Sequence, residues 1–185
     1  MKCFFAITLL FCQLLLPAQS DAERIKKFMD TLSMGGTYLI GKTIPAFELK
    51  SIQGNSYTNE SFKNKITVIN FWFEACPPCI AEMNSLEQLY NDFKQYSNFQ
   101  FLSITYENTA AINKLAEEYK ITYPVLSTTT DSCYYLNFKK GFPTTVIVDG
   151  NGLIVFFTIG GHTDTNLADL YFKTNIYPLL NSMLK

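Results

Sequence analysis

The sequence predicts an α/β fold in which a mixed central sheet is flanked by helices on both faces. Three observations support this prediction. Apolar stretches with strand character alternate with stretches of helical periodicity in the middle of the chain, as they do around parallel sheets. Asp149-Gly150-Asn151-Gly152 then joins two further strands in a strong antiparallel hairpin signal. The 185 residues, 48 % of them hydrophobic, suffice for one domain with a sizeable core.

Residues 1–20 differ in kind from the rest of the chain. Lys2 precedes an apolar run over residues 3–16, and the small residues Ala18 and Ser20 follow, as in a cleaved signal peptide. A membrane anchor is the alternative, but an apolar helix of about 14 residues spans only ~21 Å of a hydrocarbon core ~30 Å thick. We therefore expect residues 1–20 to be a signal peptide. The mature protein is expected to be exported and periplasmic, without stable membrane insertion.

Two elements are predicted ahead of the central sheet. Residues 21–33 carry apolar side chains at helical spacing and Gly35-Gly36 ends the pattern, which predicts an N-terminal helical segment over 21–36. Residues 44–49 and Ser56–Thr58 have strand character and enclose a Gly54-Asn55 turn. They predict a β-hairpin extension at the start of a domain that spans residues 37–185.

The segment Ile66–Trp72 predicts a strand buried on both faces, because it is β-branched, aromatic and apolar almost throughout. The helix that follows it begins at Pro77 and runs to about residue 96. The remaining predicted elements are a strand at 99–106, a helix at 110–119, a short strand at 123–126, a short helix at 132–138, strands at Thr144–Val148 and 153–159, and a helix at 164–184 that Pro178 kinks or interrupts.

Composition narrows the classes of function. The chain has 15 Lys and Arg residues against 16 Asp and Glu residues, so it shows no basic excess and no nucleic-acid partner is expected. Signal cleavage would remove Cys3 and Cys12 and leave Cys76, Cys79 and Cys133. Three cysteines cannot staple a disulfide scaffold, so the fold must depend on its core.

Cys76 and Cys79 are separated by two prolines and lie between the predicted central strand and the helix after it. Such a pair can bind a metal, form a permanent disulfide or exchange electrons. A zinc site needs two further ligands, and the chain offers only His162 and Cys133, so no metal and no cofactor are expected. A structural disulfide across so short a loop gains little loop-closure entropy. The strand–CxxC–helix context therefore favours redox chemistry.

Cys76 is predicted to be the attacking thiol, because a helix N-terminus stabilises a thiolate and Pro77 suits a first helical turn. Cys79, one turn further on, is placed to resolve the mixed disulfide that Cys76 forms. Glu82 shares the helix face of Cys79 and is predicted to be partly desolvated, with a raised pKa, and to take the Cys79 proton. The alternative is that Glu82 reaches solvent at the helix edge. The rest of that face is apolar: Leu86, Leu89 and Phe93.

Three motifs together resemble the exported thioredoxin-like proteins of the TlpA/ResA type. They are Asn70-Phe71-Trp72, Cys76-Pro77-Pro78-Cys79 and Gly141-Phe142-Pro143-Thr144-Thr145. Ile40-Gly41-Lys42, Pro45-Ala46-Phe47 and the Asp149-Gly150-Asn151-Gly152 turn fit the same family, and the resemblance covers about residues 40–185. It implies a thioredoxin-like fold and thiol–disulfide exchange with protein partners.

The resemblance also implies roles for individual residues. Pro143 is expected to be cis and to face the cysteine pair, so that Phe142, Pro143 and Thr144 contact the partner. Glu82 matches the acidic residue near the second cysteine. Such proteins receive electrons from a membrane thiol donor and act as reductants in tasks such as cytochrome c maturation.

Two positions bear on how closely the family pattern applies. Ala75 stands where family members often carry tryptophan, so partner preference is left open. Asn70 is neutral, as in the exported branch, whereas cytosolic thioredoxin has an acidic residue there, which supports Glu82 as the relevant acid.

Other interpretations remain alongside this one. A thiol peroxidase of the peroxiredoxin type would have threonine three residues before its nucleophile, where this chain has Phe73. A non-catalytic binding module would use the groove beside Pro143 and leave the disulfide idle. Cys133 is expected to be a core residue rather than a third redox thiol, and His162 an exposed loop residue. The sequence does not set the direction of electron flow, since ~30 mV corresponds to only ~1.4 kcal/mol.

Overall fold

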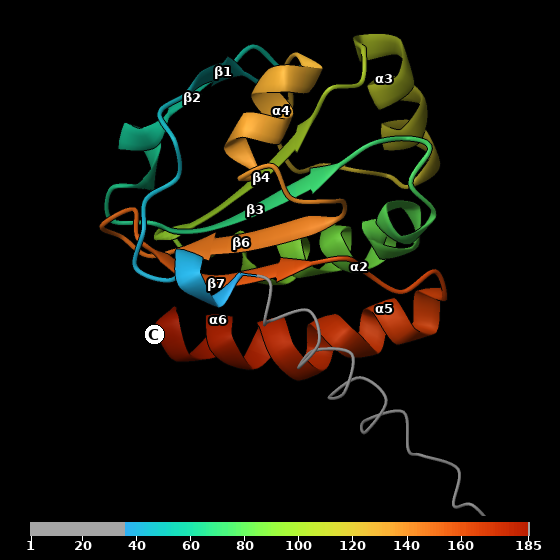
Figure 1. Ribbon diagram of the computed structural model, residues 1–185. Helices are drawn as coiled ribbons and strands as arrows, with labels where there is room; N and C mark the ends of the chain where they lie inside the picture. The colour runs from blue at the N-terminus through green and yellow to red at the C-terminus, as the bar shows by residue number, and fades with distance from the viewer. Residues whose placement is uncertain (1–35, 185) are drawn as a thin grey trace, which may run out of the picture.

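A computed structural model describes residues 36–184 of the chain. The predicted signal peptide at 1–20 and the predicted helix at 21–33 lie outside these residues. Within them, the mixed sheet flanked by helices is confirmed (Figure 1). No helix in this part of the protein combines the length and the apolar character that crossing a bilayer requires.

The central sheet has five strands in the order β5-β4-β3-β6-β7. β3 pairs in parallel with β4 and antiparallel with β6, and it lies in the middle of the sheet. β4 pairs in parallel with β5, while β6 and β7 form the predicted antiparallel hairpin. The bounds are β3 Ile66–Trp72, β4 Phe99–Thr105, β5 Val125–Ser127, β6 Thr144–Val148 and β7 Ile154–Ile159.

β3 is buried on both faces, as its composition predicts. Val68 belongs to the core cluster on one face of the sheet, whereas Ile69 and Phe71 belong to the cluster on the other. All three side chains are completely buried. Burying large apolar side chains on both sides of one strand stabilises each by about 1.5–3 kcal/mol, so β3 holds the two layers of the protein together.

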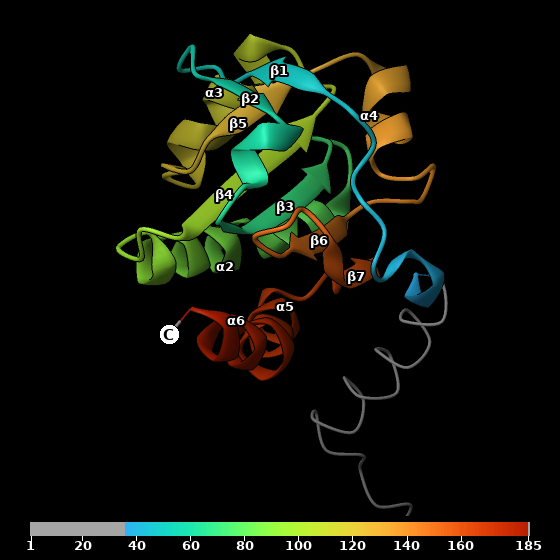
Figure 2. The same cartoon turned by 90° about the vertical axis from the view of Figure 1, so that its left-hand side faces the viewer.

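Helices cover both faces of the sheet (Figures 1 and 2). The long helix α2 (Pro77–Phe93), α3 (Thr109–Glu118) and the C-terminal helices supply side chains to the core cluster that contains Val68. α4 (Thr130–Leu136) and the short 3-10 turns η1 (Thr37–Leu39) and η2 (Asn59–Phe62) pack in the opposite cluster.

The predicted N-terminal hairpin forms, but its first strand is shorter than predicted. β1 (Glu48–Lys50) pairs with β2 (Ser56–Thr58), and the hairpin docks beside β5 where the Ile52 N–H donates to the Val125 carbonyl at 2.9 Å. Residues 44–47 are not a strand because the Asn59 side chain holds their backbone. Its Oδ1 accepts from the Phe47 N–H at 2.9 Å, and its Nδ2 donates to the Ile44 carbonyl at 3.0 Å.

The final helix is interrupted before Pro178 rather than at it. α5 (Thr165–Tyr171) passes into a π-helical turn, η3 (Phe172–Ile176), and α6 (Tyr177–Met183) then begins with Pro178 in its first turn. Proline has no N–H to donate to the carbonyl four residues earlier and its ring crowds that carbonyl. The wider π-helical turn accommodates the missing hydrogen bond and the proline ring, and the chain continues as a helix after it.

Other boundaries move by one to three residues. α2 ends at Phe93 rather than near residue 96, β5 begins at Val125 rather than 123, and α4 begins at Thr130 rather than 132. For α4 the reason is its cap, because the Thr129 hydroxyl accepts from the Ser132 N–H and starts the helix earlier.

The end of β3 is anchored by one buried hydrogen bond. The Trp72 Nε1–H donates to Ser103 Oγ on β4 at 2.7 Å, and both side chains are at most 2 % exposed. This bond holds the last residue of β3 in place four residues ahead of Cys76.

Ser103→Ala should therefore lower the free energy of unfolding by about 1–3 kcal/mol, since it leaves the buried indole N–H unpaired. Urea unfolding with an unchanged m value measures this. In a Trp72→Phe background the same substitution should cost far less, because the donor is already gone. An equal cost in both backgrounds would mean that the bond does not carry the effect.

Candidate active site

The strand register brings three separate segments to one end of the sheet. Trp72 at the end of β3 pairs with Thr105 at the end of the parallel strand β4. Phe71 pairs with Thr144 at the beginning of the antiparallel strand β6. The residues just beyond these pairs, in the segments 73–76, 106–108 and 141–143, must therefore lie side by side. The carboxyl ends of parallel strands are where α/β sheets place their sites.

Cys76 and Cys79 form a disulfide at the start of α2, with their Cα atoms 5.2 Å apart. Cys76 is the N-cap of the helix, and its Sγ accepts from the Cys79 N–H at 3.3 Å. Cys76 is 3 % exposed and Cys79 is 2 % exposed. The flanking Ala75 and Pro77 are exposed, so Cys76 lies directly beneath the surface. An N–H aimed at this sulfur at a helix N-terminus is suited to stabilise a thiolate.

Glu82 lies one turn beyond Cys79 on the buried side of α2. It is only 4 % exposed, so the alternative that it reaches solvent at the helix edge is wrong. Its Oε2 has no hydrogen-bond partner among residues 36–184. Burial raises the pKa of Glu82 well above its ordinary value of 4.5, because the ionised carboxylate loses its contact with water.

Two buried tyrosines, Tyr123 and Tyr171, lie close enough to Glu82 to feel its charge. Burial and then the nearby charges of Glu87 and Glu82 raise the pKa of Tyr123. Burial also raises the pKa of Tyr171, and the charge of Glu82 adds to that effect. Burial therefore disfavours the charged form of all three groups: Glu82, Tyr123 and Tyr171.

Gly161, in the loop after β7, lies against both Glu82 and Pro143. A Cβ at Gly161 would be 2.3 Å from Glu82 Oε1 and 3.0 Å from Pro143 Cγ. The neighbouring Gly160 has a φ of +80° and donates its N–H to the Pro143 carbonyl at 2.7 Å. A side chain at 161 would displace the Glu82 carboxylate, and the loop brings together two residues that sequence analysis singled out.

The segment before β6 has the geometry that the resemblance implies. The Phe142–Pro143 peptide bond is cis. Phe142 is half-buried, whereas Pro143 and Thr144 are buried. The Thr144 hydroxyl donates to the Gly141 carbonyl at 2.6 Å, so this side chain points into the protein and a partner would meet the backbone instead.

Sequence analysis missed a cluster of aromatic rings around Phe142. Phe73, Tyr106 and Tyr134 all have their ring centroids within 6 Å of that of Phe142. These residues are far apart in the sequence, and their only signal was a high aromatic content that is equally expected of a core.

Cys133 and His162 differ in how deeply they are buried. Cys133 is a free thiol that is completely buried in the opposite core cluster, and burial raises its pKa to about 12, as fits a core residue. His162 is half-buried rather than exposed as predicted, because the Gly160-Gly161 turn folds the loop back onto the protein.

Comparison with known proteins places these features in a family. A sequence model of the AhpC/TSA family matches residues 40–157. The thiol-disulfide oxidoreductase ResA of Geobacillus kaustophilus is 26 % identical over 129 residues, which are 69 % of this chain and 74 % of that protein. The thioredoxin-like protein YneN of Bacillus subtilis is 27 % identical over 125 residues, which are 66 % of this chain and 73 % of that one.

Solved structures share the fold. A thiol:disulfide interchange protein from a Bacteroides species superposes with a TM-score of 0.60 and 27 % identity, over 75 % of this chain and 89 % of that chain. The thioredoxin domain of a thiol-disulfide oxidoreductase from Bacteroides vulgatus gives a TM-score of 0.59 and 26 % identity, over 71 % and 96 %. The resemblance to ResA-type thioredoxin-like proteins is thus confirmed. Since the family model covers more than half of it, the chain belongs to the AhpC/TSA family.

Proposed function

We propose that this protein, a thiol–disulfide oxidoreductase of the ResA type, acts in an exported compartment as a reductant of selected protein disulfides. The observation that carries the proposal is a Cys76–Cys79 disulfide at the start of α2 with the buried carboxylate of Glu82 one turn below it. Perturbed carboxylates of this kind cluster at functional sites. A membrane thiol donor would keep the pair reduced, and cytochrome c maturation is one task that this chemistry would serve.

In the proposed reaction, the Cys76 thiolate attacks one sulfur of a partner disulfide. A mixed disulfide forms and the partner releases its other sulfur as a thiolate. Cys79 then gives up its proton and attacks the Cys76 sulfur, which expels the partner's remaining thiolate. The partner has gained two electrons, and the protein is left with the Cys76–Cys79 disulfide seen in the structure.

Glu82 is the residue that we assign to the Cys79 proton. A thiol inside the first turns of α2 is shielded from water, so a general base must come from the protein. The raised pKa of Glu82 brings its proton affinity closer to that of a thiol, which is the condition for efficient transfer. In the reverse direction, the protonated carboxyl would return the proton to the departing Cys79 thiolate.

A peroxidase of the peroxiredoxin type has less support in this site. Phe73 stands at the position of the expected threonine, and its ring packs edge-on against Phe142 with the centroids 5.3 Å apart. No hydroxyl is therefore offered to Cys76 from that position.

Glu82→Gln removes the proton acceptor and keeps the shape of the side chain. Resolution of a mixed disulfide by Cys79 should slow by about 100-fold, which is at the low end of what a general base contributes. In the parent protein the rate should rise with pH as Glu82 loses its proton, at a midpoint above 4.5, and the variant should lack this rise. Stopped-flow exchange with a model disulfide measures both, and identical profiles would exclude the role.

The pH dependence of stability in the parent protein and in Glu82→Gln tests independently whether burial raises the pKa of Glu82. Because the folded carboxyl holds its proton more tightly than the unfolded one, the native state binds more protons above pH 4.5. The parent protein should therefore lose stability as pH rises from 4.5 through the folded-state pKa, and Glu82→Gln should lose less. Urea midpoints across this range test the sign.

Gly161→Ala should displace the Glu82 carboxylate, because the added methyl group would overlap with it. The new methyl group pushes the carboxylate from its site, so the pH midpoint of resolution should move down towards that of an ordinary carboxyl, with a stability loss of about 1–3 kcal/mol. Gly141→Ala is the matched control, since its Cβ would meet only Ile159 Cγ2 at 3.7 Å. If both variants keep the parent's pH profile, Gly161 does not position Glu82.

Cys79→Ser should trap the mixed disulfide, because it retains the Cys76 thiolate and lacks the resolving sulfur. Covalent complexes should accumulate in the exported compartment, dissolve with dithiothreitol, and be absent when Cys76 is also replaced. One or two trapped species indicate a dedicated reductant, and many indicate a general oxidant or isomerase. If Cys79→Ser traps nothing that Cys76→Ser does not, exchange with proteins is the wrong function.

A further inference from the structure

Four aromatic side chains form a continuous set beside the disulfide, which we name the aromatic platform: Phe73, Tyr106, Tyr134 and Phe142. Phe142 is its centre, with ring centroids 5.3 Å from Phe73, 5.9 Å from Tyr106 and 5.2 Å from Tyr134, each edge to face. Phe73 and Tyr106 also stack on each other at 5.6 Å. Such pairs hold one another in fixed orientations.

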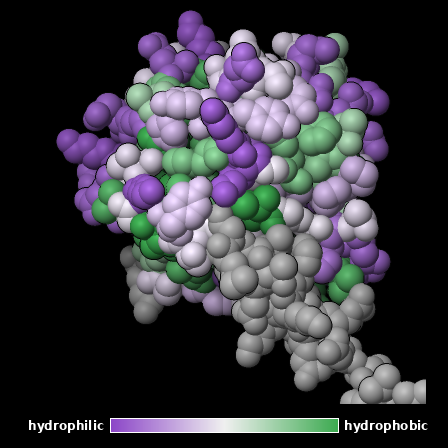
Figure 3. Space-filling view, viewed as in Figure 1, coloured by the Kyte–Doolittle hydropathy of each residue, from purple (hydrophilic) through white to green (hydrophobic). Residues whose placement is uncertain are grey.

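The platform is not part of the closed core. Phe73, Tyr106 and Phe142 are half-buried, and Tyr134 on α4 is 39 % exposed, whereas Phe71 two residues before Phe73 is completely buried. Figure 3 shows a pale green area of moderately hydrophobic side chains on the upper right of this face, with strongly hydrophilic ones along the margins and across the middle. Grouped aromatic side chains that remain accessible mark interaction sites more often than scattered ones do.

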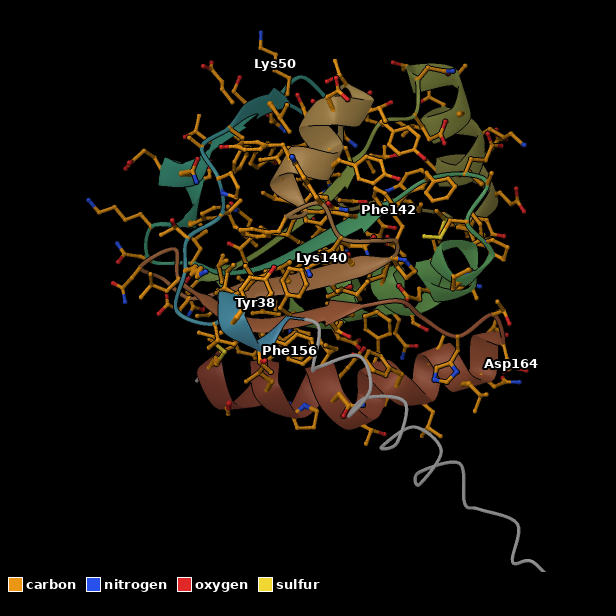
Figure 4. All side chains as sticks on the ribbon, viewed as in Figure 1. Tyr38, Lys50, Lys140, Phe142, Phe156 and Asp164 are labelled. Atoms are coloured by element: carbon orange, nitrogen blue, oxygen red, sulfur yellow. A yellow bond between two sulfur atoms is a disulfide. The ribbon has the colours of Figure 1, made fainter. Side chains whose placement is uncertain are left out.

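The platform is continuous with the site of disulfide exchange. The Phe73 carbonyl accepts from the Cys76 N–H at 3.3 Å, and Phe142 is bonded to Pro143. Figure 4 shows Phe142 at the end of the sheet where the disulfide lies. A protein segment that places its sulfur on Cys76 must therefore lie next to these rings.

The chemistry of the platform indicates what it would accept. All four members are Phe or Tyr, residue types whose side chains are uncharged at neutral pH. Two carboxylates border it: Glu74 and Glu107, whose Oε1 accepts from the Glu74 N–H at 2.9 Å. Lys114 pairs with Glu74 at 2.9 Å, which leaves one negative charge in excess. Such a surface attracts apolar and aromatic side chains and disfavours acidic ones.

We infer that the aromatic platform selects partner segments that carry an aromatic side chain within two residues of the reactive cysteine and no carboxylate there. This inference rests on the proposed function, because it names the partner class for the same exchange reaction. Ring contacts with Phe142 and Tyr134 would hold the segment while its disulfide reaches Cys76. The expected preference over a small polar side chain is about threefold to tenfold, the range that aromatic pairs supply.

The experiment uses the reduced protein and two synthetic peptides, each carrying one cysteine as a disulfide with glutathione. The peptides are identical except for the residue before the cysteine, phenylalanine in one and serine in the other. Stopped-flow rates of peptide reduction should favour the phenylalanine peptide by about threefold to tenfold. A third peptide with aspartate at this position should react more slowly than the serine peptide.

Matched variants on α4 locate the effect. Tyr134→Ala should bring the phenylalanine-to-serine rate ratio close to one, and Tyr134→Phe should restore it, because the ring and not the hydroxyl makes the contact. Tyr135→Ala is the control, since Tyr135 is the next residue, is 57 % exposed and is not a member of the platform. It should retain the parent ratio.

The two proposals fail in different ways. If the parent protein reduces the phenylalanine and serine peptides equally fast, exchange is supported but the platform does not select partners. Equal loss of the ratio in Tyr134→Ala and Tyr135→Ala also overturns the inference, since it would then reflect a general change in α4. Reduction of neither peptide overturns the proposed function and this inference together.

Discussion

The pairing of β3 with β4 on one side and β6 on the other is the constraint on which the rest of the site depends. A parallel neighbour ends where β3 ends, and an antiparallel neighbour begins there, so three distant segments meet beyond the last pairs of the ladder. Cys76, Tyr106 and Pro143 come from these three segments. A shift of one residue in either register would exchange the side chains that β3 presents to the two core clusters, and the packing of both clusters opposes it.

Glu82 shows how the fold accommodates an unfavourable group. A buried carboxylate with one oxygen that lacks a hydrogen-bond partner among residues 36–184 destabilises the ionised native state, and an apolar side chain at that place would pack more favourably. The surrounding structure nevertheless leaves space for it, because Gly161 has no side chain to occupy that space. Local departures from good packing of this kind are typical of functional positions, and the apolar cluster that α2 shares with the C-terminal helices offsets their cost.

The site thus has two parts that differ in solvent exposure and in charge. Below the disulfide lies the buried Glu82 carboxyl, between α2 and the loop after β7, with a pKa that burial raises. Beside the disulfide lies the aromatic platform, which is half exposed and carries no charge. In the proposed function the first part sets how quickly the cysteines exchange, and in the further inference the second selects the partner segments. Cys76 belongs to both parts, because it ends the loop that follows β3 and is the N-cap of α2.

The sequence by itself determined the sheet, the helices on its two faces, the cysteine pair at a helix start and the unusual place of Glu82, because each rests on local periodicity or on residues adjacent in the chain. It placed the helix interruption near Pro178 for the same local reason. Only the tertiary structure decided that Glu82 is closed off by Gly161, that His162 is half-buried, and that Phe73, Tyr106, Tyr134 and Phe142 meet. Those contacts join residues from different strands and loops, and no local pattern encodes a distance across a sheet.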